Sequence, residues 1–479
     1  MKDNFGKFGL SEEILGAIDK LGYKTPSDVQ QKVIPEINEG KDLVVKSQTG
    51  SGKTAAFAIP ICEKLQWENN KAQALVLEPT RELAVQVKED FVNIGRFKRI
   101  RPVAIFGKDS FSDQIKALKL RTHVVVGTPG RILDHLDRGT LDVSEVKYLV
   151  IDEADKMLNM GFIEQVEDII KAVNCPRETM LFSATISKEI QDLCTAYMDN
   201  PTNIEMEDQE LISDRIEHNL YRVNNHDKVE TLNKVLLLEK PKTAVIFCGT
   251  KDNVDLVFEN LQERQYSVGK IHGGMEQKER LQVMNAFRKG DFRILVATDV
   301  AARGIDVEGI THVINVDIPM EKEAYVHRIG RTARAGESGK AITFVTRYED
   351  KFLQEIFQYI GFQIEEKEIS DIKEEELKEA LSILRSKPQP KVEKAKELNK
   401  DITKIYINGG RKKKIRPGDI VGAITKVEGV TGDDIGIIDI EDGGSYVEIL
   451  NGKGNKVIND LQQGTIKGKK LKVEKARKK

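Results

Sequence analysis

Short apolar runs alternate with longer amphipathic stretches through the first two hundred residues. The runs lie at 42–46, 74–77, 103–106, 123–126, 148–151 and 179–182. This alternation predicts βαβ units, in which a parallel sheet is covered by helices on both faces. After a polar join near 208–214 the pattern restarts, with runs at 243–247, 267–271, 292–297, 312–315 and 341–345. The chain is therefore predicted to contain two tandem α/β domains.

The pattern changes twice in the last quarter of the chain. Residues 365–400 are densely charged, have partly helical spacing and contain the Pro-Gln-Pro run, so we expect an extended linker there. The last eighty residues then predict the order β-α-β-β-α-β, as in ferredoxin-like folds. The expected strands and helices, in chain order, lie at 402–408, 417–427, 435–440, 446–450, 455–462 and 470–473.

Charge adds one feature that the apolar pattern lacks. The formal net charge of the 479 residues is only −2, yet residues 400–479 hold 18 Lys and Arg against 11 Asp and Glu. A basic segment attached to an acidic body indicates a separate polyanion-binding module. The four cysteines are widely spaced and are expected to be buried apolar residues. With neither a signal peptide nor an apolar run of membrane-spanning length in the sequence, a cytoplasmic location is expected.

The first candidate for chemistry is SQTGSGKT at 47–54, which follows an apolar run and opens a helical stretch. Gly50 and Gly52 would let backbone N–H groups surround phosphate oxygens, and the helix N-terminus adds positive potential. Lys53 would reach the β- and γ-phosphates, and Thr54 would hold Mg²⁺. Ser47 replaces the first glycine of the general pattern. A Gly-rich turn before a helix is the alternative, but the context favours nucleotide binding.

The second candidate is YLVIDEAD at 148–155, an apolar run that ends in acidic residues. Carboxylates at the carboxyl end of a strand lie where α/β sheets bind ligands. Asp152 would hold Mg²⁺ largely through water, and Glu153 would position and deprotonate the attacking water. Taken alone, a solvated helix cap is as good an explanation. Together with a phosphate loop, the run predicts a catalytic role.

Several further motifs occur in an order that resembles the DEAD-box family of RNA-dependent ATPases. They are PTRELA at 79–84, TPGR at 128–131, SAT at 183–185, ATDVAARGID at 297–306 and HRIGRTARAG at 327–336. The resemblance covers residues 1 to about 365. It implies an ATP-dependent RNA helicase with two RecA-like domains, at 1–208 and 209–364, and ATP and Mg²⁺ as cofactors.

The resemblance also implies roles for individual residues. Phe5 would stack on the adenine and Gln30 would hydrogen-bond its edge, although Gln30 by itself is typical of a helix surface. Arg331 and Arg334 would act as arginine fingers on a site whose other half is in the first domain. The remaining ATP contacts would be Lys24, Thr25, Gln48, Thr49, Gly50, Ser51, Gly52, Lys53, Thr54 and Asp306. The residues expected to couple hydrolysis to domain closure are Ser183, Thr185, Asp299, His327 and Arg328.

RNA contacts of the two core domains are implied in the same way. On the first domain they are Thr80, Arg81, Gly107, Thr128, Gly130 and Arg131. On the second they are Gly273, Gln277, Arg280 and Thr298. Most such contacts reach phosphate and sugar, so the core should be indifferent to base sequence and should prefer RNA through the 2′-OH. Gly107-Lys108 replaces a Gly-Gly pair common in the family.

The C-terminal segment loosely matches an RNA-recognition motif. Tyr406 and Tyr446 would lie on the two central strands, although Gly444 and Ile449 occupy positions that are usually aromatic. Either tyrosine could equally belong to the core. The basic cluster of Arg411, Lys412, Lys413, Lys414 and Arg416 is a second candidate for RNA binding.

The segments NGGRKKKIR and YVEILNGKG resemble the RNA-binding domain of the bacterial DbpA (YxiN) subfamily. This resemblance implies that residues 401–479 recognise a hairpin in 23S ribosomal RNA and that the protein acts on precursors of the large ribosomal subunit. A monomer is expected. The rival hypotheses are an ATP-gated RNA clamp or chaperone, a DNA helicase, and an assembly factor whose ATPase is vestigial.

Overall fold

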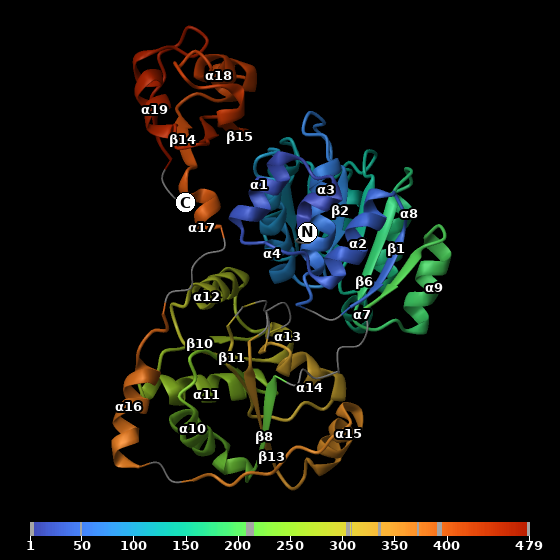
Figure 1. The fold of residues 1–479 in the computed structure, drawn as a ribbon, viewed down its shortest axis with the longest axis vertical. Coiled ribbons are helices and arrows are strands. Elements are labelled where there is room, and N and C mark those ends of the chain that lie inside the picture. Colours follow the sequence, from blue (N-terminus) through green and yellow to red (C-terminus); the bar gives the residue numbers. More distant parts are fainter. Residues whose placement is uncertain are drawn as a thin grey trace. The chain divides into compact units, whose positions relative to one another are not determined.

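The computed structural model describes residues 4–47, 50–206, 215–302, 307, 309–333, 337–370, 373–389 and 395–476. The chain forms two compact units (Figure 1). The first unit comprises Met1–Met206 together with Glu393–Lys479, and the second comprises Glu207–Val392. In the first unit the N-terminal part and the C-terminal segment each form a sheet of their own.

The N-terminal part of the first unit is built on a seven-stranded parallel sheet with the strand order β3-β4-β2-β5-β6-β1-β7. Its strands are β1 (Leu43–Lys46), β2 (Ala74–Leu77), β3 (Pro102–Ile105), β4 (Val124–Gly127), β5 (Tyr148–Ile151), β6 (Glu178–Ser183) and β7 (Thr202–Glu205). The central strands are buried on both faces: Val76 packs in one core, and Leu75 and Leu77 pack in the other. This is why they read as continuous apolar runs in the sequence.

Helices cover both faces of this sheet. The first core includes residues of α1 (Glu12–Lys20), α2 (Asp28–Asn38), α3 (Lys53–Lys64) and α4 (Arg81–Ile94). The opposite core includes residues of α6 (Pro129–Asp137), α7 (Ala154–Asn159), α8 (Ile163–Ala172) and α9 (Lys188–Tyr197). A 3₁₀ turn, η1 (Phe5–Phe8), precedes α1, and α5 (Phe111–Leu118) follows β3. The predicted doubly covered parallel sheet is confirmed.

The second unit repeats this architecture with a six-stranded parallel sheet, in the order β10-β11-β9-β12-β13-β8. Its strands are β8 (Ile216–Arg222), β9 (Ala244–Phe247), β10 (Val268–Ile271), β11 (Ile294–Ala297), β12 (His312–Asn315) and β13 (Gly339–Val345). Its helices are α10 (Lys228–Glu239), α11 (Lys251–Glu263), α12 (Gln277–Lys289), α13 (Asp299–Ala302), α14 (Lys322–Ile329), α15 (Asp350–Ile360) and α16 (Glu374–Arg385). Both large sheets are thus parallel sheets whose strands alternate with helices along the chain.

Helix α16 falls in the segment predicted as a linker, and it packs on the second unit. Leu384 is fully buried and belongs to the same core as α10 and α11. The backbone N–H of Ser267, just before β10, donates to the carbonyl of Leu384 at 2.8 Å. Arg293 donates to the carbonyls of Pro241 and Ser386. The helical part of the segment is therefore held against the second sheet over these residues.

The C-terminal segment forms a four-stranded antiparallel sheet with two helices on one face. Its elements are β14 (Thr403–Ile407), α18 (Pro417–Ile424), β15 (Ile435–Ile440), β16 (Ser445–Ile449), α19 (Gly454–Gln463) and β17 (Val473–Lys475). The strand order β15-β16-β14-β17 is that of the predicted ferredoxin-like arrangement. The last strand begins three residues later, and ends two residues later, than the sequence indicated. A short helix, α17 (Lys396–Lys400), precedes this domain.

Two strands were not anticipated from the sequence. Both β7 and β8 lie at the edge of their sheets, and β7 has only one fully buried residue, Ile204. Edge strands are half solvated, so their sequences are polar and lack the apolar run that marks a central strand. Along the residues that the structure describes, no helix is long and apolar enough to cross a membrane.

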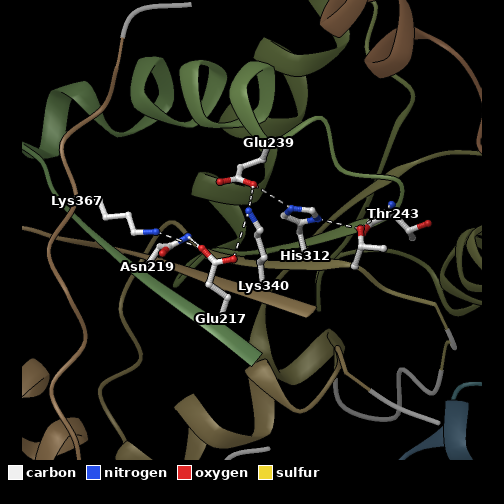
Figure 2. A network of polar contacts seen from close by, with 8 residues as sticks. Glu217, Asn219, Glu239, Thr243, His312, Lys340 and Lys367 are labelled. Carbon is white, nitrogen blue, oxygen red and sulfur yellow. Dashed lines mark hydrogen bonds and ion pairs between the residues drawn. The ribbon is translucent and has the colours of Figure 1, made fainter. Parts of the chain in front are cut away.

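A network of polar side chains links strands β8, β13 and β12 of the second sheet to helix α10 (Figure 2). The Glu239 carboxylate accepts from Lys340 Nζ at 2.8 Å and lies 3.4 Å from His312 Nε2. Lys340 also lies 3.5 Å from Glu217, which in turn pairs with Lys367 at 3.2 Å. The hydrogen bond with His312, together with Lys340, lowers the pKa of Glu239 from 4.5 to about 2.

This network predicts a pH dependence of stability in the second unit. A carboxyl group whose pKa is lowered by folding stabilises the folded state above its ordinary pKa, and this contribution is lost as the pH falls. We expect a loss of about 3 kcal/mol between pH 4.5 and pH 2. Amide hydrogen exchange in β12 and β13 would measure it. Glu239→Gln is the control: its exchange should lack this component, and an unchanged pH profile in the variant would contradict the assignment.

Candidate ATP site and RNA-contact surfaces

The phosphate loop leaves the carboxyl end of β1 and enters α3. Gly50 and Gly52 adopt φ angles of 86° and 95°, a left-handed conformation that glycine accepts without strain. Lys53 is the first residue of α3 and is only 6% exposed. Its Nζ donates to the Ser47 carbonyl at 3.1 Å and lies 4.0 Å from Asp152 Oδ1. The lysine is thus held over the loop, as phosphate binding requires. Gln48 and Thr49 lie outside the described residues.

Gln30 lies against the phosphate loop instead of on an open helix surface. It is 3% exposed, and its Nε2 donates to the Gly52 carbonyl at 3.2 Å. Its Oε1 accepts from the N–H of Ser27 at 2.9 Å, which closes a capping box at the start of α2. A Cβ on Gly52 would lie 2.8 Å from Gln30 Nε2. A side chain at position 52 would therefore have to push Gln30 aside, and the φ angle of 95° favours glycine there in any case.

The other predicted adenine contacts lie near the same end of α2. Phe5 is 3% exposed and packs edge-to-face against Phe8 and Tyr23, with ring centroids 6.1 and 6.3 Å apart. Lys24 and Thr25 are exposed. Phe5 is thus a member of the first core as well as a candidate base contact, and its stacking on adenine stays a prediction.

The acidic run begins where β5 ends, beside the phosphate loop. Asp152 and Glu153 are 5% and 6% exposed. Glu153 adopts a left-handed conformation, with φ of 51° and ψ of 48°, at the position that precedes the first residue of α7. This backbone turn brings its N–H to Asp152 Oδ1 at 2.9 Å. Residues other than glycine seldom adopt such angles, and strain of this kind is concentrated at functional sites.

Burial and repulsion from a neighbouring carboxylate raise the pKa of Asp152. Removal from water, together with the charge of Glu153, raises the pKa of Asp152 to about 6, although Lys53 opposes the shift. Carboxylates crowded in this way suit a bound cation, which neutralises them. The donor set of Thr54, Asp152 and nucleotide phosphates is one that Mg²⁺ prefers. The residues present therefore fit a Mg²⁺–ATP complex.

Two charged residues of this site were missed by the sequence analysis. Lys156 Nζ lies 2.6 Å from Glu153 Oε1, and both side chains are buried. Their spacing of three residues on a helix was a readable signal. Glu78 is completely buried next to Asp152, because β2 and β5 are neighbours and both end in an acid. Burial, followed by the charges of Asp152 and Glu153, raises the pKa of Glu78 well above its ordinary value.

Ser183 connects three parts of the site. It is fully buried at the end of β6, and its carbonyl accepts from the N–H of Ser47 at 2.9 Å. Its Oγ accepts from the N–H of Asp155 at 3.2 Å and donates to the carbonyl of Thr185 at 2.6 Å. Through these hydrogen bonds, a shift in the phosphate loop or in the acidic run would move Ser183 and, with it, the exposed Thr185. This geometry is compatible with the predicted coupling role.

The predicted RNA contacts of the first domain lie at the same carboxyl edge, on its other half. Thr80 caps α4 after β2, and its Oγ1 accepts from Leu83 N–H. Gly107 follows β3, and a Cβ there would lie 3.5 Å from the Arg81 guanidinium. Thr128, Gly130 and Arg131 begin α6 after β4. Because β3, β4 and β2 are adjacent strands, the fold brings these residues together.

Arg131 is already engaged within its own domain. Its guanidinium donates to Gln114 Oε1 at 2.9 Å and to the Asp109 carbonyl at 3.3 Å. It also lies over the Phe111 ring, 5.3 Å from the centroid. These contacts orient the side chain, so its contact with RNA would start from a fixed position.

In the second unit the candidate residues again follow the carboxyl ends of neighbouring strands. Gly273, Gln277 and Arg280 lie between β10 and the first turn of α12, and Thr298 follows β11. The N–H of Thr298 donates to the Ile271 carbonyl, which ties the two strand ends together. The structure thus brings together the four predicted RNA contacts of this unit at one edge.

Arg328 and Asp299 form a two-point ion pair inside the second unit. Arg328 is 2% exposed, and its Nε and NH2 lie 2.6 Å from the two carboxylate oxygens of Asp299. Its NH1 donates to Asn315 Oδ1 and to the Asp317 carbonyl. Arg331 lies one turn further on, and its Nε donates to the His327 carbonyl at 3.2 Å. Asp306 and Arg334 lie outside the described residues.

The C-terminal domain places its predicted RNA residues on two surfaces. Tyr406 and Tyr446 are register partners on β14 and β16, and their ring centroids are 5.3 Å apart on the sheet face away from the helices. Arg411, Lys412 and Lys413 form an exposed 3₁₀ turn, and Lys414 follows it. Asn451 and Lys453 of the YVEILNGKG segment instead bind the buried Asp434, at 2.9 and 2.7 Å.

A phosphate loop and an acidic pair at the carboxyl edge of one parallel sheet, followed by a second sheet of the same class, define a two-domain ATPase of the P-loop class. Residues 27–193 match the family described as DEAD/DEAH box helicase, and residues 227–336 match the helicase conserved C-terminal domain. Residues 404–475 match the DbpA RNA binding domain.

Known relatives agree with these matches. The ATP-dependent RNA helicase DbpA of Bacillus subtilis (strain 168) is 56% identical over 477 residues, covering 99% of this chain and 100% of that protein. The DEAD-box ATP-dependent RNA helicase CshA of Geobacillus kaustophilus (strain HTA426) is 47% identical over 345 residues, or 72% of this chain and 74% of that one. The structure of S. cerevisiae Dbp5 bound to RNA and ADP BeF3 is 31% identical, with a TM-score of 0.71 over 80% of this chain and 100% of that one.

The chain therefore belongs to the DEAD-box family of ATP-dependent RNA helicases, and within it to the group that carries a DbpA RNA-binding domain. The predicted family and enzyme class are confirmed, as is the predicted combination of two RecA-like domains with a C-terminal α+β domain.

Proposed function

We propose that this helicase uses ATP turnover to separate short RNA duplexes and that its C-terminal domain directs it to a hairpin of 23S ribosomal RNA during large-subunit assembly. The observation that carries the proposal is the division of one sheet edge in the first domain. Lys53, Asp152 and Glu153 occupy the β1–β6–β5 half of the carboxyl edge, and the candidate RNA contacts occupy the β2–β4–β3 half. ATP and RNA would thus bind to a single rigid sheet.

The hydrolytic step is assigned to Glu153. Mg²⁺, when bound, neutralises the phosphate charge that develops on hydrolysis. Thr54 and Asp152 would hold the ion, and Lys53 would contact the β- and γ-phosphates. Glu153 would orient the attacking water and take its proton as general base. Its 2.6 Å contact with Lys156 Nζ supports this role, since the ammonium fixes the direction of the carboxylate.

The second domain would supply Arg331 and Arg334 to the transition state of the same reaction. RNA that contacts both domains would favour this contribution, so hydrolysis would depend on RNA. The core would bind RNA mainly through phosphate and sugar, and would therefore be indifferent to base sequence. Bending of one strand of a short duplex would release the other without translocation.

Target choice would come from the C-terminal domain. The exposed turn Arg411–Lys413 and the net positive charge of residues 400–479 support phosphate binding there. A tethered module that holds a hairpin raises the local concentration of neighbouring RNA at the unselective core. The preferred substrates would thus be precursors of the large ribosomal subunit.

We expect deletion of residues 401–479 to abolish the preference for 23S ribosomal RNA while leaving weak, sequence-blind RNA-stimulated ATPase. The measurement is the ATPase rate against a panel of RNAs with and without the 23S hairpin fragment. Lys412→Glu in the full chain should weaken the response to the hairpin, whereas Lys426→Glu, another exposed lysine of the same domain, should not. Retained selectivity in the truncated chain would contradict the targeting role. Release of duplex strands with ATP turnover would separate a helicase from an ATP-gated clamp.

A further inference from the structure

The C-terminal sheet has one face without helices, and that face is acidic. Residues directly opposite each other on antiparallel strands point to the same side, so the face can be read from the register. Tyr406 pairs with Tyr446 and with Glu474, and Asp439 pairs with Tyr446. Glu448 lies two residues after Tyr446 on β16 and shares its side. Three carboxylates therefore surround the two tyrosines on this face, against one lysine, Lys404, whose Nζ lies 5.4 Å from the centroid of the Tyr446 ring.

Carboxylates are poor neighbours for an RNA backbone but good partners for arginine. The first domain offers arginines in the segment between α4 and β3, where Arg96, Arg99 and Arg101 occur within six residues. Arg96 NH1 lies 2.7 Å from Glu448 Oε1. Arg101 Nε lies 3.2 Å from Asp439 Oδ1. The two surfaces are thus complementary in charge and lie in contact within the first unit.

The central pair of this contact is buried. Arg96 is 9% exposed and Glu448 is 8% exposed. The second oxygen of Glu448 accepts no hydrogen bond from the described residues, so Arg96 is the main group that compensates this charge. Breaking a buried pair by removing one partner leaves an uncompensated charge and is strongly unfavourable. The pair therefore favours this register of the contact over any docked arrangement that would leave one of the two charges unpaired.

Further contacts surround the central pair. The Arg99 NH2 donates to the Gly432 carbonyl at 2.6 Å, and Arg96 NH2 reaches Asn399 Oδ1 at 3.4 Å. The short helix α17 packs against α1, and its Leu398 is fully buried. The contact thus extends from the sheet face to the segment that enters the C-terminal domain.

From this geometry we infer that the helix-free face of the C-terminal sheet is a docking surface for the Arg96–Arg101 segment of the first domain in the same chain. The segment precedes β3, whereas the phosphate loop follows β1. Docking therefore takes place at the amino ends of the parallel strands, and the ATP site lies at their carboxyl ends. Docking leaves the basic turn Arg411–Lys413 exposed. RNA that stacked on Tyr406 and Tyr446 would have to displace the first domain. The inference does not depend on the identity of the RNA target.

The full-length chain contains its own reporter for this contact. Trp67 is the only tryptophan, and the Arg99 guanidinium lies over its ring at 5.4 Å. An acceptor dye on Glu428→Cys, at an exposed position four residues before Gly432, would accept energy from Trp67. Cys175→Ser removes the one half-exposed thiol, since the other three cysteines are buried. Energy transfer then measures the docked fraction without cutting the chain.

We expect strong transfer in this parent protein. Arg96→Glu or Glu448→Arg should each lower the ratio of docked to undocked chains by about 10²–10³-fold, the consequence of leaving one buried charge uncompensated. The exchange Arg96→Glu with Glu448→Arg should restore most of the transfer. Glu474→Arg is the matched control, because Glu474 lies on the same face but pairs with Lys472 at 2.6 Å. It should leave the transfer unchanged.

Two results would overturn the inference. One is transfer in the parent no higher than in Glu448→Arg, and the other is a double exchange no better than either single change. A Glu448→Arg domain that fails to fold would be seen as lost protection of β14 and β16 amides. In that case Arg96→Glu, which alters only the first domain, decides the question alone. High salt should also reduce the transfer, since the flanking pairs are partly solvated.

Discussion

Replacing Glu153 with Gln is expected to lower the rate of ATP hydrolysis by about 10²–10⁴-fold. Gln has the same size and can still accept the hydrogen bond that Lys156 Nζ gives at 2.6 Å. It cannot take a proton from water, so the general base is lost while the geometry is kept. Removing one negative charge next to the buried Asp152 also relieves repulsion at the phosphate site. Binding of ATP and RNA should therefore be retained or strengthened.

The measurement is the single-turnover hydrolysis rate, compared with the equilibrium affinity for ATP and for RNA. Glu164→Gln is a matched control, because it makes the same isosteric change at an exposed position of the first turn of α8. Its turnover should equal that of the unaltered chain. Turnover close to normal in Glu153→Gln would refute the assignment of the base. Loss of ATP binding in this variant would instead indicate a structural role for Glu153.

Replacing Arg331 with Ala is expected to lower turnover by about 10³–10⁵-fold, the effect of removing an arginine finger. The guanidinium would act on charge that develops only in the transition state, so the affinity for ATP should change little. The paired variant is Arg328→Ala, three residues earlier, in the last turn of α14. Arg328 is buried, and its removal should cost about 1–3 kcal/mol of stability in the second unit, since Asn315 Oδ1 and the Asp317 carbonyl lose their donor.

The two arginines thus separate a catalytic from a structural role by two different measurements. Turnover at saturating ATP should fall most in Arg331→Ala, and protection of amides in β12 and β13 should fall most in Arg328→Ala. The assignment of Arg331 would be wrong if its variant kept turnover within tenfold of the unaltered chain. A loss of stability in Arg331→Ala as large as in Arg328→Ala would show that the fall in turnover has a structural cause.

The central strands of both large sheets were predictable because they are buried on both faces. Their burial demands continuous apolar runs, and β2, β5 and β12 have the predicted bounds. The edge strands β7 and β8 were missed because solvation removes that signal. Helix α16 was predicted as a charged, partly helical stretch, but its attachment to the second sheet depends on Leu384 and Arg293, which are far apart in sequence.

In the candidate ATP site, too, some residues could be predicted from the sequence and others could not. The phosphate loop and the acidic run could be found because each is a local pattern at the end of an apolar run. Gln30, by contrast, is typical of a helix surface by itself and is buried only because α2 approaches Gly52. Glu78 carried no distinct signal, since its neighbour Asp152 comes from a strand over seventy residues away.

The sequence by itself determined the fold class, the family and the order of the motifs, because these depend on local periodicity and on residue types at short spacing. Only the tertiary structure decided which charges meet. It paired Arg328 with Asp299 inside the second unit, and inside the first it paired Arg96 with Glu448, which are 352 positions apart in the sequence. The physical reason is that an ion pair is set by proximity in space, and the strand order that creates this proximity is not written in any one segment.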